Sequence, residues 1–131
     1  MIERVEKDQN TAKSLIRTAE EHLNAAFDNI KIKHYDWAVA IAYSAMLNAG
    51  RALMAARGYR PESESHHLAV VRFCSEILGK ETEQLVILFN RYRVRRHDIV
   101  YGEKEKSVSE SEAMRSVENA KKFVEEIKKR I

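Results

Sequence analysis

The chain has very few residues that interrupt a helix. Its 131 residues include one proline and four glycines, and no alternation of apolar and polar residues lasts long enough to predict a strand. Apolar residues instead recur three and four positions apart, which is the spacing of one face of an α-helix. The sequence therefore predicts an all-α fold. With 44% hydrophobic residues, the chain suits a single domain of residues 1–131 with one core.

Two long apolar stripes predict the first two helices. The break between them, at residues 31–34, is short, so these helices should be antiparallel neighbours. The second helix is apolar around much of its circumference and should form the centre of the bundle, and Gly58 with Pro61 predicts its end. Asp36 and Trp37 are expected to cap this helix and to join the core. The stripes are Ala12, Leu15, Ile16, Ala19, Leu23, Ala26, Phe27 and Ile30, then Ala38, Ile41, Ala42, Ala45, Ala49, Ala52, Leu53 and Ala56.

The rest of the chain predicts three further helices. Ser109 and Glu112 form a capping-box pattern in front of the last one. The charged residues 103–108 have no apolar period and predict a solvated loop. These elements make an antiparallel up-and-down bundle of four to five helices. The third helix is predicted at about residues 63–78, the fourth at about 81–100 with Gly102 ending it, and the apolar stripe of the fifth at 114–127.

Charge and composition exclude several classes of protein. The 23 Lys and Arg residues against 20 Asp and Glu give a net charge of only +3, too small for a dedicated high-affinity nucleic-acid binder. Cys74 has no second cysteine for an intrachain disulfide and lies in an apolar run, so it should be a small core residue. The N-terminal residues are charged from Glu3 onward, and the longest apolar stretch is shorter than the roughly 20 residues of a membrane span. We therefore expect a soluble, cytoplasmic protein with no membrane segment.

Histidines and carboxylates show no metal-ligand spacing. His66 and His67 are adjacent and diverge on a helix, and neither His22 nor His34 has a partner at metal-ligand spacing. We expect neither a metal site nor a cofactor.

Residues 90–101 concentrate the polar chemistry of the chain, with four arginines, one histidine and two tyrosines. Guanidinium groups recognise phosphate and carboxylate, whereas cations near a helix C-terminus can also serve only its dipole. A helical wheel singles out Arg96, because it falls within the apolar stripe of Leu85, Leu88, Phe89, Tyr92 and Ile99. A buried unpaired charge is costly, so Arg96 should lie in a cleft, reach a carboxylate or sit at a subunit interface.

A polar strip is predicted beside Arg96. Asn90, Arg93, His97 and Tyr101 follow one another at spacings of three and four residues, so they share one side of the helix. Together with Arg96 they can form an anion-binding wall. The neighbouring residues Arg91 and Arg95 are interpreted as solubilising and capping residues only.

The motifs of this chain resemble those of the HEPN domain (higher eukaryotes and prokaryotes nucleotide-binding) over about residues 15–127. The second predicted helix is similar to the helix-two signature of the prokaryotic members. The last motif falls where the family has an arginine, a polar residue and, several residues later, a histidine. The matching segments are Tyr35-Asp-Trp-Ala38, Ala42-Tyr43-Ser-Ala-Met46, Ala49-Gly-Arg-Ala-Leu53, Gly58-Tyr-Arg-Pro61 and Arg96-His-Asp-Ile-Val-Tyr101.

The resemblance implies a homodimer in which the motif arginines of two subunits face each other across a shared cleft. Arg96 matches the motif arginine and His97 the polar residue after it, while Arg51 falls within the helix-two signature and is a further candidate for the cleft. Several members are metal-independent ribonucleases, often toxins, and many pair with a small nucleotidyltransferase. Those properties are expectations for this chain.

Tyr101 departs from the nuclease pattern, because the nuclease members have histidine there. A tyrosine with a pKa near ~10 is a poor general base at neutral pH, whereas histidine near ~6.5 suits that role. A minimal branch of the family also has tyrosine here. The leading hypothesis is therefore a homodimeric binding protein that pairs with a nucleotidyltransferase and holds nucleotide or RNA phosphate at Arg93, Arg96, His97 and Tyr101.

Two other hypotheses stay open. The first is a metal-independent, toxin-like endoribonuclease of a toxin–antitoxin pair, in which Arg96 stabilises phosphate charge and His97 relays a proton. The second is a purely structural bundle in which the arginines only cap and solubilise the fourth helix.

Overall fold

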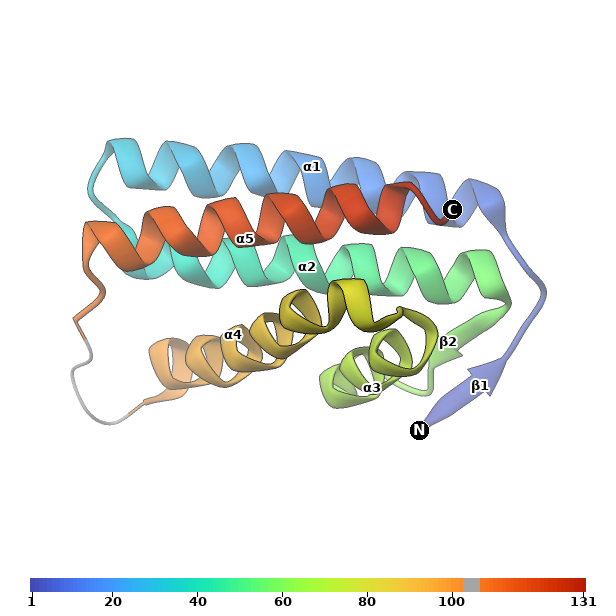
Figure 1. Cartoon of the computed structure of the whole chain (residues 1–131). Helices are drawn as coiled ribbons and strands as arrows, with labels where there is room; N and C mark the ends of the chain where they lie inside the picture. The colour runs from blue at the N-terminus through green and yellow to red at the C-terminus, as the bar shows by residue number, and fades with distance from the viewer. Residues whose placement is uncertain (103–106) are drawn as a thin grey trace.

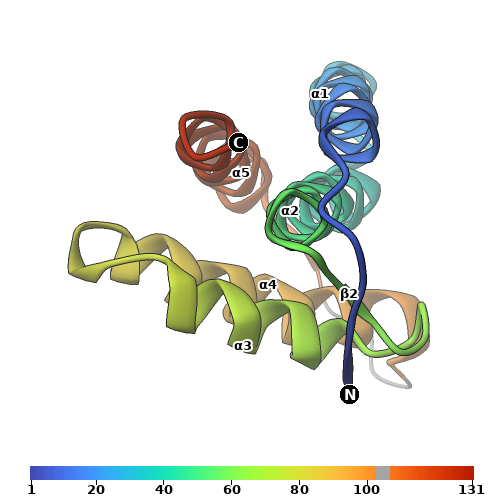
Figure 2. The same cartoon turned by 90° about the vertical axis from the view of Figure 1, so that its right-hand side faces the viewer.

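Five α-helices account for most of the molecule in a computed structural model, which describes residues 1–102 and 107–131. In Figure 2, α1, α2 and α5 are seen nearly end-on, whereas α3 and α4 run across the view as a second layer. The predicted all-α helical bundle is confirmed. The elements are β1 (Ile2–Arg4), α1 (Gln9–Lys31), α2 (Tyr35–Arg57), β2 (Tyr59–Pro61), α3 (His67–Ile77), the short 3-10 helix η1 (Lys80–Thr82), α4 (Glu83–Tyr101) and α5 (Glu110–Lys128) (Figure 1).

The ends of α1 and α2 have local causes. The Asp8 carboxylate accepts a hydrogen bond from the Thr11 N–H at 2.9 Å and caps the start of α1. Lys33, with a φ of 65°, turns the chain from α1 into α2. Gly58 has a φ of 84° and ends α2 in the left-handed conformation that favours glycine. The predicted break at residues 31–34 and the predicted stop at Gly58 are confirmed.

Helix α2 lies at the centre of the bundle, as its sequence predicted. It is buried along nearly its whole length, and its largest fully buried side chain is Tyr43. Gly50 allows α3 to come close, since a Cβ there would lie 2.6 Å from Val70 Cγ1. Within the described residues, α2 is the one helix long and apolar enough to cross a membrane, but 78% of its apolar window is buried inside the bundle.

Two aromatic residues are less buried than predicted. Phe27 is 45% exposed and Trp37 is 53% exposed, so neither belongs to the core. Both lie near the turn between α1 and α2, at one end of the bundle. The Lys31 ammonium lies 4.9 Å from the centroid of the Phe27 ring. Asp36 lies in the first turn of α2 and accepts a hydrogen bond from the Trp37 N–H at 2.8 Å, but the cap position itself belongs to His34.

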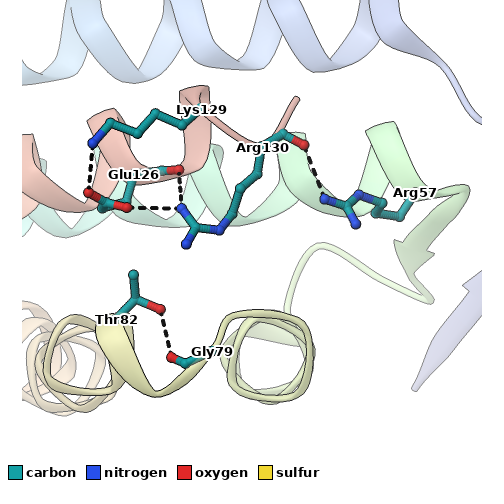
Figure 3. Close-up of polar contacts among 6 residues, drawn as sticks. All are labelled: Arg57, Gly79, Thr82, Glu126, Lys129 and Arg130. Atoms are coloured by element: carbon teal, nitrogen blue, oxygen red, sulfur yellow. Dashed lines mark hydrogen bonds and ion pairs between the residues drawn. The ribbon is translucent and has the colours of Figure 1, made fainter.

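The segment after α2 differs from its prediction. The third helix begins at His67, so residues 63–66 form a loop, and η1 precedes α4. The Thr82 hydroxyl donates to the Gly79 carbonyl at 3.0 Å at the start of η1 (Figure 3). The strands β1 and β2 were not predicted; they pair antiparallel, with Ile2 opposite Pro61. Three residues are too few for a recognisable alternation.

Both ends of α5 are fixed by polar contacts. The Ser109 hydroxyl accepts from the Glu112 N–H at 3.0 Å, which confirms the predicted N-terminal cap. At the other end Glu126 binds the Arg130 guanidinium at 2.9 Å, and Arg57 donates to the Arg130 carbonyl at 3.1 Å (Figure 3). Residues 103–106 of the predicted loop lie outside the described residues.

Candidate anion-binding site

A cavity of about 470 Å³ lies between the first turn of α3 and the C-terminal half of α4. Its size is within the range of small-molecule sites. Among the described residues that line it, no side chain carries a carboxylate. The side chains that could bind or move charge there are His66, His67, Arg93, Arg96, His97 and Tyr101.

The α4 wall of the cavity contains the polar strip expected from the sequence. The Arg93 Nε donates to Asn90 Oδ1 at 3.0 Å, which fixes one edge of its guanidinium. The rings of His97 and Tyr101 lie 5.1 Å apart, and the Arg96 guanidinium carbon lies 5.7 Å from the Tyr101 ring centroid. Within the described part of the chain neither arginine forms an ion pair. Their charge is therefore available to an anion in the cavity.

The α3 wall was not predicted. His67 faces α2, where its Nδ1 lies 3.0 Å from the hydroxyl of the buried Tyr43. Burial lowers the pKa of His67 below its ordinary value, and the charges of Arg51, Arg96 and Arg93 lower it further, so the neutral imidazole is favoured at neutral pH. The adjacent histidines were visible in the sequence, but only tertiary packing brings the start of α3 to α4.

Arg51 contributes from behind the wall rather than from within it. It is not among the residues that line the cavity, and its guanidinium donates to the Glu64 carbonyl at 3.0 Å. Its charge nevertheless acts on Tyr43 and His67, since it lowers the pKa of both groups. Arg51 therefore holds the loop before α3 and adds positive potential to the site.

The first turn of α3 adds a further favourable field for an anion. The residue at its cap position, His66, makes no side-chain cap hydrogen bond. Leu68 and Ala69 of this turn line the cavity. A helix N-terminus carries a partial positive charge, so an anion beside Arg93 and Arg96 would also interact with the end of α3. In residues 1–102 and 107–131, no group of three or more histidines, cysteines or carboxylates could hold a metal ion.

Replacing Tyr43 by Phe should weaken the wall between α2 and α3. Removal of the hydroxyl leaves the His67 Nδ1 without its partner, and we expect the free energy of unfolding to fall by about 1 kcal/mol at neutral pH. Burial raises the pKa of Tyr43 from 10.0 to about 12, although Arg93, Arg96 and Arg51 oppose the rise. Between pH 10 and about pH 12, Tyr43 therefore keeps its hydroxyl proton in the folded state and loses it in the unfolded state.

The pH profile provides the check. Stability from Tyr43 is fully present below pH 10 and is lost as the pH rises to about 12, so this part of the alkaline decline should be absent in the Tyr43→Phe variant. Urea unfolding followed by circular dichroism at several pH values measures it. Tyr35→Phe, on the same helix, is the control. Equal stability and an unchanged alkaline decline in Tyr43→Phe would contradict the prediction.

Fold and site together define a class of protein: an antiparallel helical bundle with an arginine- and histidine-lined cavity between two of its helices. The model of the HEPN domain family matches residues 12–131, and the chain belongs to that family. The crystal structure of TT1696 from Thermus thermophilus is similar, with a TM-score of 0.75 and 18% sequence identity over 93% of this chain and 99% of that chain. This likeness shows a shared fold. No curated protein matches the chain at a significant level.

Proposed function

We propose that this HEPN domain is a binding module that holds a phosphate group of a nucleotide or of RNA at Arg96. The observation that carries the proposal is the shared cavity. Arg93 and Arg96 line it, neither forms an ion pair with another described residue, and none of the described lining side chains is a carboxylate. Guanidinium groups bind phosphate oxygens through paired hydrogen bonds. His97 and Tyr101 form the outer rim, where a ribose or a base would contact them.

The module acts as a homodimer in this proposal. The family resemblance implies that the motif arginines of two subunits face a shared cleft. Helix α4 supports this arrangement, because Ile87, Val94 and Tyr101 recur every seven residues on one face and are 43%, 48% and 63% exposed. A second copy packed along this face would bring two Arg96 cavities near each other. The same resemblance implies a small nucleotidyltransferase as partner protein. The cytoplasm remains the location expected from the sequence.

Substitution of Arg96 by Gln tests the proposed site. Losing one charged hydrogen-bond donor should weaken phosphate binding by roughly 10- to 100-fold. We would measure the affinity for a fluorescently labelled, short single-stranded oligoribonucleotide by anisotropy and for AMP by calorimetry. Arg17→Gln, an exposed arginine on α1, is the matched control. Affinities of Arg96→Gln equal to those of the control would overturn the proposal, and a light-scattering mass of a single 15.2 kDa chain would overturn its dimer.

A metal-independent, toxin-like endoribonuclease of a toxin–antitoxin pair is the second candidate. It is favoured by the histidines that line the same cavity as Arg96, since His97 or His67 could accept the proton of a ribose 2′-hydroxyl that attacks the adjacent phosphate. Tyr101 is a poor base for this step. Incubating the purified protein with RNA distinguishes the two functions. Cleavage that persists in both Arg96→Ala and His97→Ala would come from a contaminant.

A further inference from the structure

Helix α4 borders a second cavity on its opposite flank. This cavity, of about 440 Å³, lies between α4 and α5 and shares no described lining residue with the cavity at Arg96. Leu88 provides an apolar surface within it. Its polar side chains are Arg91, Tyr92 and Arg95 from α4 and Glu112, Arg115 and Asn119 from α5.

Among these described lining residues, Glu112 is the only one with a carboxylate, and it forms an ion pair with Arg95. Arg95 donates to both oxygens of Glu112, at 2.7 Å and 3.1 Å, and both side chains are mostly buried. The hydrogen bonds that Arg95 donates to Glu112 raise the pKa of Arg95 above its ordinary value. Glu112 is therefore already occupied. Three arginines and one glutamate leave a charge of +2 on the cavity, carried by Arg91 and Arg115.

Arg91 and Arg115 approach from facing helices. Both are exposed, and in the described part of the chain neither forms an ion pair. An anion placed between them could accept from both guanidinium groups at once, one from each wall. On α4 Arg91 lies about 60° from Val94, at the edge of the proposed dimer face, and it lines the cavity that α4 forms with α5.

The Tyr92 hydroxyl adds a third donor. The Asn119 amide donates to the Tyr92 oxygen at 3.1 Å, so the hydroxyl proton remains available to a ligand. Tyr92 is only 8% exposed, so packing restricts its ring, and the residue lines the cavity. The cavity thus presents donors from α4 and α5, while its one charged acceptor is paired.

We propose that this cavity is a second binding site for a phosphate group, clamped between Arg91 and Arg115 and bound by the Tyr92 hydroxyl. A tetrahedral phosphate offers oxygens to donors in three directions, whereas one guanidinium fork already satisfies a planar carboxylate. The Arg95–Glu112 pair acts as a positioning contact that joins the two walls. The phosphate belongs either to a free nucleotide or to an RNA backbone.

Phosphate titrations of the full chain test the second site. Inorganic phosphate would be added to ¹⁵N-labelled protein, with the Asn119 side-chain amide reporting on this cavity and the His97 ring on the first. In the double variant Arg91→Gln and Arg115→Gln, we expect phosphate to shift the Asn119 signal with at least about tenfold lower affinity, while the His97 response stays. Arg17→Gln with Arg72→Gln removes the same charge elsewhere and is the control.

The two proposals fail separately. An Asn119 response that is unchanged in the Arg91 and Arg115 variant would overturn the second site and leave the first. Arg96→Gln should remove the His97 response alone, and its failure to do so would overturn only the first. The oligoribonucleotide identifies the source: weaker binding in the double variant assigns an RNA backbone, whereas unchanged binding together with a lost phosphate response assigns a free phosphate compound.

Discussion

Phe89→Ala should lower the free energy of unfolding by about 3–5 kcal/mol, the range for a large aromatic side chain removed from a core. Phe89 is fully buried where α2, α4 and α5 meet, with its ring centroid 5.8 Å from that of Tyr43 and 4.9 Å from that of Phe123. A domain of this size is stable by only about 5–15 kcal/mol. The variant should therefore be marginally folded.

Chemical denaturation followed by circular dichroism measures this effect. Gln84→Ala, at an exposed position five residues away on the same helix, should change stability by no more than about 0.5 kcal/mol. A loss below about 1 kcal/mol in Phe89→Ala would mean that α4 does not pack on the core as described. Because Phe89 supports Tyr43, and Tyr43 contacts His67, the variant should also loosen the cavity at Arg96.

Gly50→Ala should destabilise the protein, although the same change inside a helix usually stabilises it by about 1 kcal/mol. The added Cβ would lie 2.6 Å from Val70 Cγ1 and 3.3 Å from Cys74 Sγ, and both side chains are fully buried. Val70 is β-branched and cannot turn its methyl group away freely. Overpacking of this kind costs about 1–3 kcal/mol, which should exceed the gain in helix propensity.

A double-mutant cycle separates the two effects. Val70→Ala removes the methyl group that the new Cβ would meet, so the double variant should be more stable than the sum of the two single changes predicts. Gly79→Ala is the control, since a Cβ there meets no atom within 4 Å. A Gly50→Ala variant more stable than the original protein would show that α2 and α3 are not in such close contact.

The parts of the fold that depend on local sequence could be predicted. Gly58 ends α2 because it takes up a left-handed backbone conformation, and Ser109 begins α5 because its side chain accepts a hydrogen bond from a nearby N–H. Both effects involve only residues that are close in the sequence. The pairing of β1 with β2 joins residues far apart in the chain, for example Glu3 and Arg60, and a three-residue strand carries no pattern of its own. Exposure of Trp37 likewise depends on where the bundle ends.

Of the two walls of the candidate site, the sequence predicted the one on α4 but not the one on α3. Arg93 and Arg96 share one helix, so helical geometry alone places them together. The opposite wall, with His67 and its contact to Tyr43, comes from a helix that begins 24 residues after that tyrosine. No spacing rule connects those two positions. Arg91 was assigned to solubility alone, because a single helix does not show that α5 brings Arg115 to the same cavity.

The half-exposed position of Trp37 has a spectroscopic consequence. It is the one tryptophan of the chain, and 53% of its surface is already in water in the folded state. Its emission should therefore resemble that of an unfolded chain, with a small wavelength shift on denaturation. Helix content, which falls throughout the bundle on unfolding, is the more sensitive signal. A tryptophan introduced in place of Phe123 would instead report directly from the core, where that ring has no exposed surface.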